Sequence, residues 1–129
     1  MFTLDTNIVI GYLNDEAEIA DQILSWRREP ARFCISVITE IEALSFPKLT
    51  TSEIAKIQRL LQELTIIPAD SQLGRLAAEL RRQYQFKLGD SIIVATARLT
   101  NSILVTRDKS LLKKAKQIIS VKTILKSPA

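Results

Sequence analysis

The sequence comprises 129 residues, of which 47% are hydrophobic and 25% are charged, so it predicts a single globular domain over residues 1–129. It contains no histidine and one cysteine, which excludes Ser-His-Asp and Cys-His catalysis, histidine-containing zinc sites and an intramolecular disulfide. The net charge of +4 favours polyanionic partners only weakly, and three widely spaced glycines form neither a Rossmann fingerprint nor a Walker A loop.

The first third of the chain alternates between apolar runs and helical spacing. Residues 2–4 predict a buried strand, and the apolar residues between 8 and 13 recur at helical intervals. Either Asn14 or Asp15 is expected to cap a second helix, which Pro30 breaks.

The middle of the chain repeats this alternation. Residues 32–36 predict a second strand, after which Thr39 is expected to open a helix. Thr39 and Glu42 have the spacing of a capping box, as do Thr50 and Glu53 at the start of the next helix.

The last part of the chain contains three further apolar runs. Residues 65–67 predict a third strand, and Asp70 is placed to cap the helix that follows. Residues 91–99 are apolar on almost every side, which indicates a helix covered by its neighbours. Residues 103–105 predict a fourth strand, and residues 118–121 a fifth, with a short helix between them.

This alternation of short apolar strands with helices predicts an α/β fold, with a mostly parallel sheet flanked by helices on both faces. No apolar run approaches the roughly 18 residues of a membrane span, and the first residues lack the basic and apolar regions of a secretory signal. We therefore expect a cytoplasmic protein with no membrane association. Ligands of such sheets bind outside the carboxyl ends of the strands.

Carboxylates occur at several of the expected strand ends. Asp5 follows the first strand, Glu40 and Glu42 follow the second, Asp108 follows the fourth, and Asp90 begins the buried helix that leads to it. An Asp at a strand-to-helix junction is also a good helix cap, which explains each residue taken singly. Parallel strands, however, would bring most of these acids to one edge of the sheet.

Four carboxylates gathered at one edge would repel one another. At about 5 Å and an effective dielectric near 20, the repulsion is roughly 3 kcal/mol per pair. The groups must therefore spread apart, take up protons or bind a cation, and an all-oxygen cluster selects Mg²⁺ or Mn²⁺ over zinc. Such an ion can activate water and stabilise a phosphodiester under attack, which requires no histidine.

Four motifs follow one another along the chain: Leu4-Asp5-Thr6-Asn7, Ser36-Val37-Ile38-Thr39 followed by Glu42, Leu88-Gly89-Asp90-Ser91-Ile92-Ile93-Val94-Ala95-Thr96-Ala97, and Leu104-Val105-Thr106-Arg107-Asp108. In this order they resemble the PIN-domain nucleases, and most closely the VapC-like toxins of bacterial toxin-antitoxin pairs. The resemblance implies a three-layer fold with a five-stranded parallel sheet and metal-dependent endoribonuclease activity. It also implies a homodimer and a cognate antitoxin.

The resemblance assigns catalysis and the binding of Mg²⁺ or Mn²⁺ to four acids, which are Asp5, Glu42, Asp90 and Asp108. It assigns the orientation of water or carboxylates to three polar residues, which are Thr6, Asn7 and Thr106. Glu40 is an alternative, but Glu42 stands at the family's spacing from Thr39 and is preferred. The two glutamates point about 200° apart on a helix, so only one is expected to face the site. Asn101 stands where the family often has glycine before the fourth strand.

Basic residues cluster toward the end of the chain, where residues 109–129 include six lysines and no acid. Lysines on a helix are usually a solvated face, but here they are also candidates for drawing an RNA backbone toward the acids. The candidate RNA-binding residues are Arg107, Lys109, Lys113, Lys114 and Lys116.

Two other functions compete with the nuclease. In a metal-dependent phosphatase or phosphoacceptor domain Asp5 would be the nucleophile, but Asn7 stands where a second Asp would be expected. In a non-catalytic RNA- or protein-binding domain of the same fold we expect one of the acids to be missing, and none is.

Overall fold

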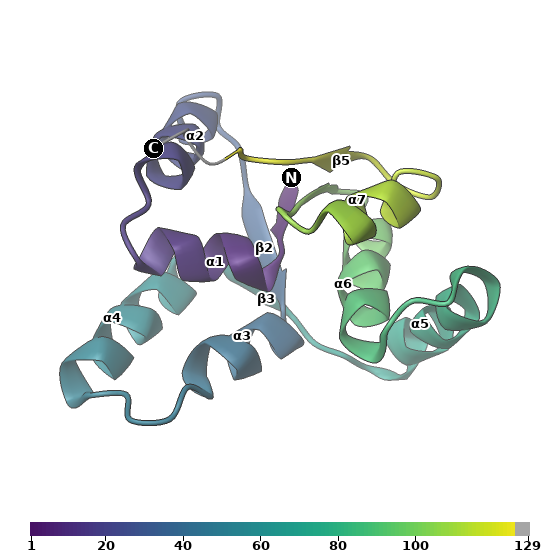
Figure 1. Ribbon diagram of the computed structural model, residues 1–129, viewed down its shortest axis with the longest axis horizontal. Coiled ribbons are helices and arrows are strands. Elements are labelled where there is room, and N and C mark those ends of the chain that lie inside the picture. The colour runs from purple at the N-terminus through teal and green to yellow at the C-terminus, as the bar shows by residue number, and fades with distance from the viewer. Residues whose placement is uncertain (126–129) are drawn as a thin grey trace.

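The computed structural model describes residues 1–125 and contains one five-stranded sheet, in which every neighbouring pair of strands is parallel (Figure 1). Its strands are β1 (Phe2–Leu4), β2 (Phe33–Ser36), β3 (Thr65–Ile67), β4 (Ile103–Val105) and β5 (Val121–Lys122). They lie in the order β3-β2-β1-β4-β5, which places β1 at the centre. The end of the predicted domain, residues 126–129, lies outside the described residues.

Seven helices connect and cover these strands within residues 1–125: α1 (Thr6–Leu13), α2 (Ala17–Arg27), α3 (Val37–Leu44), α4 (Thr51–Gln62), α5 (Ser71–Tyr84), α6 (Leu88–Leu99) and α7 (Lys109–Ala115). None of them is long and apolar enough to cross a membrane.

The sheet is covered on both faces, which gives three layers. One core cluster joins Leu4 and Ile35 of the sheet to buried residues of α1, α2 and α4. A second cluster joins Leu104 to buried residues of α5, α6 and α7 on the opposite face. Side chains alternate along each strand, so a sheet buried on both faces needs apolar residues at nearly every position. The predicted three-layer α/β fold is confirmed.

Several predicted element boundaries are confirmed. Thr50 and Glu53 form a reciprocal capping box at the start of α4, and Asp70 caps α5 by accepting a hydrogen bond from the Leu73 main chain at 3.0 Å. The covered helix is α6, whose residues 93–97 are all buried. Asn101 has a φ of 50°, the left-handed conformation that glycine adopts most easily and asparagine tolerates.

Two predicted caps are wrong. Asn14 ends α1 instead of starting α2, because its N–H donates back to the Ile10 carbonyl at 3.0 Å; α2 starts after Glu16, which makes no side-chain capping bond. The predicted box of Thr39 and Glu42 is absent, because Ser36 already caps α3 and Thr39 is buried within that helix.

The last strand is shorter and begins later than predicted, at residues 121–122 instead of 118–121. The main-chain N–H groups of Ile118 and Ile119 both donate to the Ala115 carbonyl at 2.9 Å. These bonds hold the chain in a turn after α7, so the two isoleucines pack against the core without joining the sheet.

Candidate active site

Asp5 and Thr106 lie side by side at the carboxyl edge of the sheet. Leu4 pairs with Val105 in the register of β1 and β4, and the Asp5 N–H donates to the Val105 carbonyl at 2.9 Å. Parallel pairing therefore brings together two residues that are 101 positions apart in the sequence. Asp5 is only 6% exposed, an unusual degree of burial for a carboxylate.

The Asp5 carboxylate is surrounded by donors. Its Oδ1 accepts a hydrogen bond from the Thr6 main chain at 2.8 Å, by which Asp5 caps α1. Its Oδ2 accepts hydrogen bonds from Nδ2 of Asn7 at 3.1 Å and from the hydroxyl of Thr106. Three donors fix the orientation of this buried group, which offsets part of the cost of burying it.

Asp108 is connected to the same group through Thr106. The Asp108 N–H donates to the Thr106 hydroxyl at 3.1 Å, and the Arg107 N–H donates to Oδ1 of Asn7 at 3.2 Å. Oδ1 of Asp108 caps α7 by accepting main-chain hydrogen bonds from Ser110 and Leu111. The capping explanation therefore holds for Asp108, as it does for Asp5, but it leaves Oδ2 of Asp108 without a capping role.

Glu42 is joined to the edge by Thr6. The Thr6 hydroxyl donates to Oε1 of Glu42 at 2.9 Å and lies 3.0 Å from the hydroxyl of the buried Thr39. Glu40 lies in a different place, lining a shallow hollow with Leu44 and residues of α4. Of the two glutamates, Glu42 is the one that the structure links to the Asp5 helix.

Electrostatic interactions place Asp5 among the other acids. Burial raises its pKa above the usual value of 3.8. Hydrogen bonds from Thr106 and Thr6 oppose this rise, while the negative charges of Asp90 and Asp108 add to it.

Asp90, in the first turn of α6, responds to the same neighbours. Burial raises its pKa, and the charges of Asp108 and Glu42 raise it further, whereas Lys87 and Lys114 act in the opposite direction. The helix-cap explanation does not apply to Asp90, because α6 begins at Leu88 and Asp90 lies inside its first turn. Electrostatic interactions thus link Asp5 to Asp90 and Asp108, and link Asp90 to Asp108 and Glu42.

The donor chemistry of this cluster suits a hard divalent cation, because the four acids offer only carboxylate oxygens. Within residues 1–125, no three acidic or cysteine side chains lie close enough together to enclose a metal ion as they stand. Burial is the main cause of the raised pKa values of Asp5 and Asp90, and repulsion from neighbouring acids adds to it; a bound cation would offset that repulsion.

The predicted RNA-binding residues do not form one surface. Arg107 has only 16% of its side chain exposed and is bound to acidic residues of the protein. Lys109 directly follows Asp108 and lines the same groove as Thr6 and Asn7. Lys116 lies at the opposite edge, near residues that precede β4.

The other two lysines differ in their contacts. Lys113 is exposed on α7, and Lys114 donates to the Gln85 carbonyl at 3.2 Å, close enough to Asp90 to affect its pKa. The sequence did not lead us to expect Lys87 at this site. Lys87 precedes Asp90 by three residues at the start of α6, and residues three apart on a helix are neighbours, so the spacing could have indicated this pair.

An open groove of about 1080 Å³ begins at Thr6 and Asn7. It runs past Ile10 and Leu112 toward the segment from Thr123 to Leu125. The groove therefore connects the edge that carries the acids with a partly apolar surface between α1 and the end of the described chain.

The family model for the PIN domain matches residues 2–117 of this sequence. The chain belongs to the PIN domain family. A comparison with curated protein sequences gave no match.

Several solved structures have a fold similar to that of this chain. A chain of the toxin-antitoxin complex from Klebsiella pneumoniae is 28% identical, with a TM-score of 0.78, and the match covers 98% of this chain and 100% of that one. For VapBC-5 from Mycobacterium tuberculosis the identity is 25%, the TM-score 0.61 and the coverage 95% of each chain. A chain of the DNA-bound VapBC from Salmonella typhimurium shares the fold, with 19% identity and a TM-score of 0.79. The match covers 96% of this chain and 98% of that one. The resemblance to VapC-like PIN proteins is confirmed.

Proposed function

We propose that this PIN domain is a divalent-metal-dependent endoribonuclease that hydrolyses RNA phosphodiester bonds and acts in the cytoplasm as the toxin of a toxin-antitoxin pair. The observation that carries this proposal is the electrostatic coupling of Asp5, Glu42, Asp90 and Asp108 at one edge of the sheet. A cluster of like charges around the buried Asp5 is unfavourable for folding, and carboxyls whose pKa is perturbed in this way occur preferentially at functional sites.

The four acids are proposed to hold Mg²⁺ or Mn²⁺. When bound, the metal supplies a water of lowered pKa and stabilises the charge that develops on the phosphate. Thr6, Asn7 and Thr106 orient the carboxylates of Glu42 and Asp5 through the hydrogen bonds described above. Asp90 and Asp108 interact electrostatically with each other and with Asp5.

For RNA binding we propose the lysines that lie near the acids. Lys109 borders the acidic edge, and Lys87 and Lys114 act electrostatically on Asp90. Positive charges beside the carboxylates attract the phosphate backbone and limit its repulsion from the site.

Protein partners are proposed from the matched structures, two of which are toxin-antitoxin complexes by name and one a VapBC complex bound to DNA. We propose a cognate antitoxin and a homodimer. Exposed apolar side chains support protein contacts: Ile41 is 57% exposed and Phe46 51%, both at α3 or just after it. The groove beside Thr6 and Asn7 provides a second partly apolar surface next to the acids.

A phosphoacceptor function is less well supported. Both oxygens of Asp5 accept hydrogen bonds from the protein, and the residue is 6% exposed, so neither oxygen is placed for nucleophilic attack. A binding domain without catalysis is the main alternative outcome of the experiment below.

The test is cleavage of total cellular RNA by the purified protein with Mg²⁺, Mn²⁺ or EDTA. We expect discrete metal-dependent fragments from the wild type, none from Asp90→Asn or Glu42→Gln, and wild-type cleavage from the matched control Glu40→Gln. Mn²⁺ should also raise the unfolding temperature of the wild type and raise that of Asp90→Asn less. A folded protein that binds RNA but cleaves none under any metal would support the non-catalytic alternative.

A further inference from the structure

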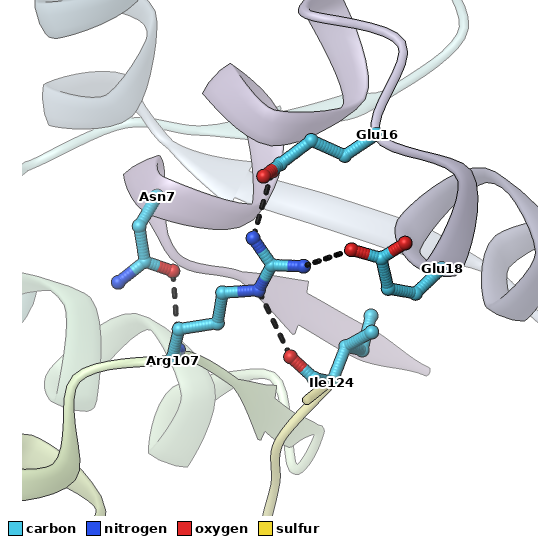
Figure 2. A network of polar contacts seen from close by, with 5 residues as sticks. All are labelled: Asn7, Glu16, Glu18, Arg107 and Ile124. Atoms are coloured by element: carbon cyan, nitrogen blue, oxygen red, sulfur yellow. Dashed lines mark hydrogen bonds and ion pairs between the residues drawn. The ribbon is translucent and has the colours of Figure 1, made fainter. Parts of the chain in front are cut away.

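Arg107 lies between Thr106 and Asp108 in the chain, and its side chain extends toward Glu16, Glu18 and the Ile124 carbonyl (Figure 2). Its Nη1 donates to Oε2 of Glu16 at 2.7 Å, and its Nη2 lies 3.8 Å from Oε1 of Glu18. Its Nε donates to the Ile124 carbonyl at 2.9 Å. One guanidinium group therefore joins the start of α2, the segment after β5 and the loop after β4.

The same residue contacts the candidate active site through its main chain. The Arg107 N–H donates to Oδ1 of Asn7, whose Nδ2 donates to Asp5. The next residue, Asp108, is held by the Thr106 hydroxyl. The loop of three residues that carries Asp108 is thus bonded to the site on one side and anchored by the Arg107 side chain on the other.

A glycine in α1 leaves space for the ion pair of Arg107 and Glu16. Gly11 lies in α1, where glycine costs roughly 1 kcal/mol relative to alanine. A Cβ at this position would lie less than 3.0 Å from the Glu16 carboxylate and from Cδ1 of Ile19. The glycine therefore lets Glu16 pack across α1 toward Arg107.

We infer that Arg107 is a positioning residue of the proposed nuclease: its guanidinium anchors the loop that carries Asp108 to α2 and to the Ile124 carbonyl. The inference rests on the proposed function, and it replaces a direct RNA contact for Arg107 with a role inside the protein. The attraction within a pair that is largely shielded from water is screened less than that of a pair on the surface, and removing one partner leaves the other charge uncompensated. Arginine suits this role because its planar fork donates in several directions at once, which lysine cannot do.

The chain offers a matched control in the ion pair of Arg27 and Glu63. Its oxygen and nitrogen lie 3.2 Å apart, but the two side chains are 40% and 57% exposed. The pair joins α2 to the end of α4, and neither residue contacts the acidic edge. Arg27→Gln therefore removes an Arg–Glu pair without disturbing the loop of Asp108.

The experiment compares Arg107→Gln, Arg107→Lys, Glu16→Gln and Arg27→Gln in the full chain. Hydrogen exchange of the Arg107 and Asp108 main-chain amides reports the anchoring directly, because side-chain oxygens of Asn7 and Thr106 are their acceptors. The kcat and KM for cleavage of a short RNA in Mn²⁺ report its effect on the reaction.

For Arg107→Gln we expect both amides to exchange at least tenfold faster than in the wild type, relative to amides of β2. We also expect kcat to fall at least tenfold, while KM stays within twofold. Arg107→Lys and Glu16→Gln should also speed the exchange of the two amides and lower kcat, but by smaller factors. Arg27→Gln should change neither the exchange nor kcat. If Arg107→Gln does not fold, Arg107→Lys and Glu16→Gln test the inference: faster exchange of the two amides together with a lower kcat supports it.

The inference is overturned if both amides keep wild-type exchange in the folded variants. It is also overturned if the loss falls on KM and varies with salt, as a direct phosphate contact would require. Absence of cleavage by the wild type would refute the proposed nuclease, while hydrogen exchange would still support or overturn the anchoring of the loop by Arg107.

Discussion

The Thr6 hydroxyl donates to Oε1 of Glu42 at 2.9 Å, and this single bond connects residues 36 positions apart. Thr6 opens α1 directly after Asp5, and Glu42 lies in the second half of α3. The buried hydroxyl of Thr39 lies 3.0 Å from the same oxygen of Thr6. Glu42 is thereby tied to the helix that Asp5 caps, although its side chain comes from an exposed position.

We predict that Thr6→Val reduces RNA cleavage about tenfold, because it removes the hydroxyl that orients Glu42 while keeping the shape of the side chain. The free energy of unfolding should change by less than about 1.5 kcal/mol, the net value of one hydrogen bond. Thr6→Ser, which keeps the hydroxyl, should cleave at close to the wild-type rate. Equal activity of the valine and serine variants would show that this bond does not serve the reaction.

Asp90→Asn should stabilise the protein at pH 7. Burial and Asp108 raise the pKa of Asp90 in the folded state, so between 3.8 and the raised value the folded chain binds more protons than the unfolded chain. Stability from this carboxyl is therefore fully present below pH 3.8 and is lost as the pH rises through the raised value.

The amide of Asp90→Asn does not ionise, so we expect a gain in stability at pH 7, which solvent screening of this partly exposed group keeps below about 1 kcal/mol. Urea unfolding of both proteins between pH 3.5 and 7 measures the difference, which should shrink toward zero at the acidic end. A difference that stays constant with pH would assign the change to packing instead of ionisation.

Lys109 and Lys116, at the two ends of α7, should differ in their effect on RNA binding. Lys109 lies at the edge that carries the acids and Lys116 at the opposite edge. In EDTA, Lys109→Ala should weaken RNA binding several-fold and lower the slope of log affinity against log salt by about 0.7, the value for one phosphate contact on a single strand. Lys116→Ala is the control and should leave both within error. If the two variants lose RNA affinity equally, the RNA is attracted by the net charge of the protein and not by a specific contact with Lys109.

Two glycines in helices should respond oppositely to alanine. At Gly11 a Cβ would meet the Glu16 carboxylate and Ile19, so we expect Gly11→Ala to destabilise the protein by about 2 kcal/mol. At Gly74 in α5 no atom lies within 4 Å of the added Cβ, so Gly74→Ala should stabilise it by about 0.5–1 kcal/mol. Denaturant unfolding measures both. A neutral Gly11→Ala variant would show that Glu16 can move aside at no cost.

Local signals in the sequence predicted most elements correctly. The box of Thr50 and Glu53 and the cap at Asp70 involve residues three positions apart, so the sequence alone determines them. The pattern failed for Thr39, which has the same spacing to an acid. Ser36 occupies the cap of that helix, and Thr39 is needed in the interior, where it meets Thr6.

The sequence by itself predicted the parallel sheet, because short apolar strands and polar strand ends are properties of neighbouring residues, and the four candidate acids followed from the resemblance of its motifs to the PIN family. Only the tertiary structure showed that Glu42 accepts a hydrogen bond from Thr6 while Glu40 lines a separate hollow. It also turned the Arg107 side chain toward Glu16 and separated Lys109 from Lys116. The physical reason is that these features depend on contacts between side chains that are far apart in the chain. Strand register and helix packing determine those contacts.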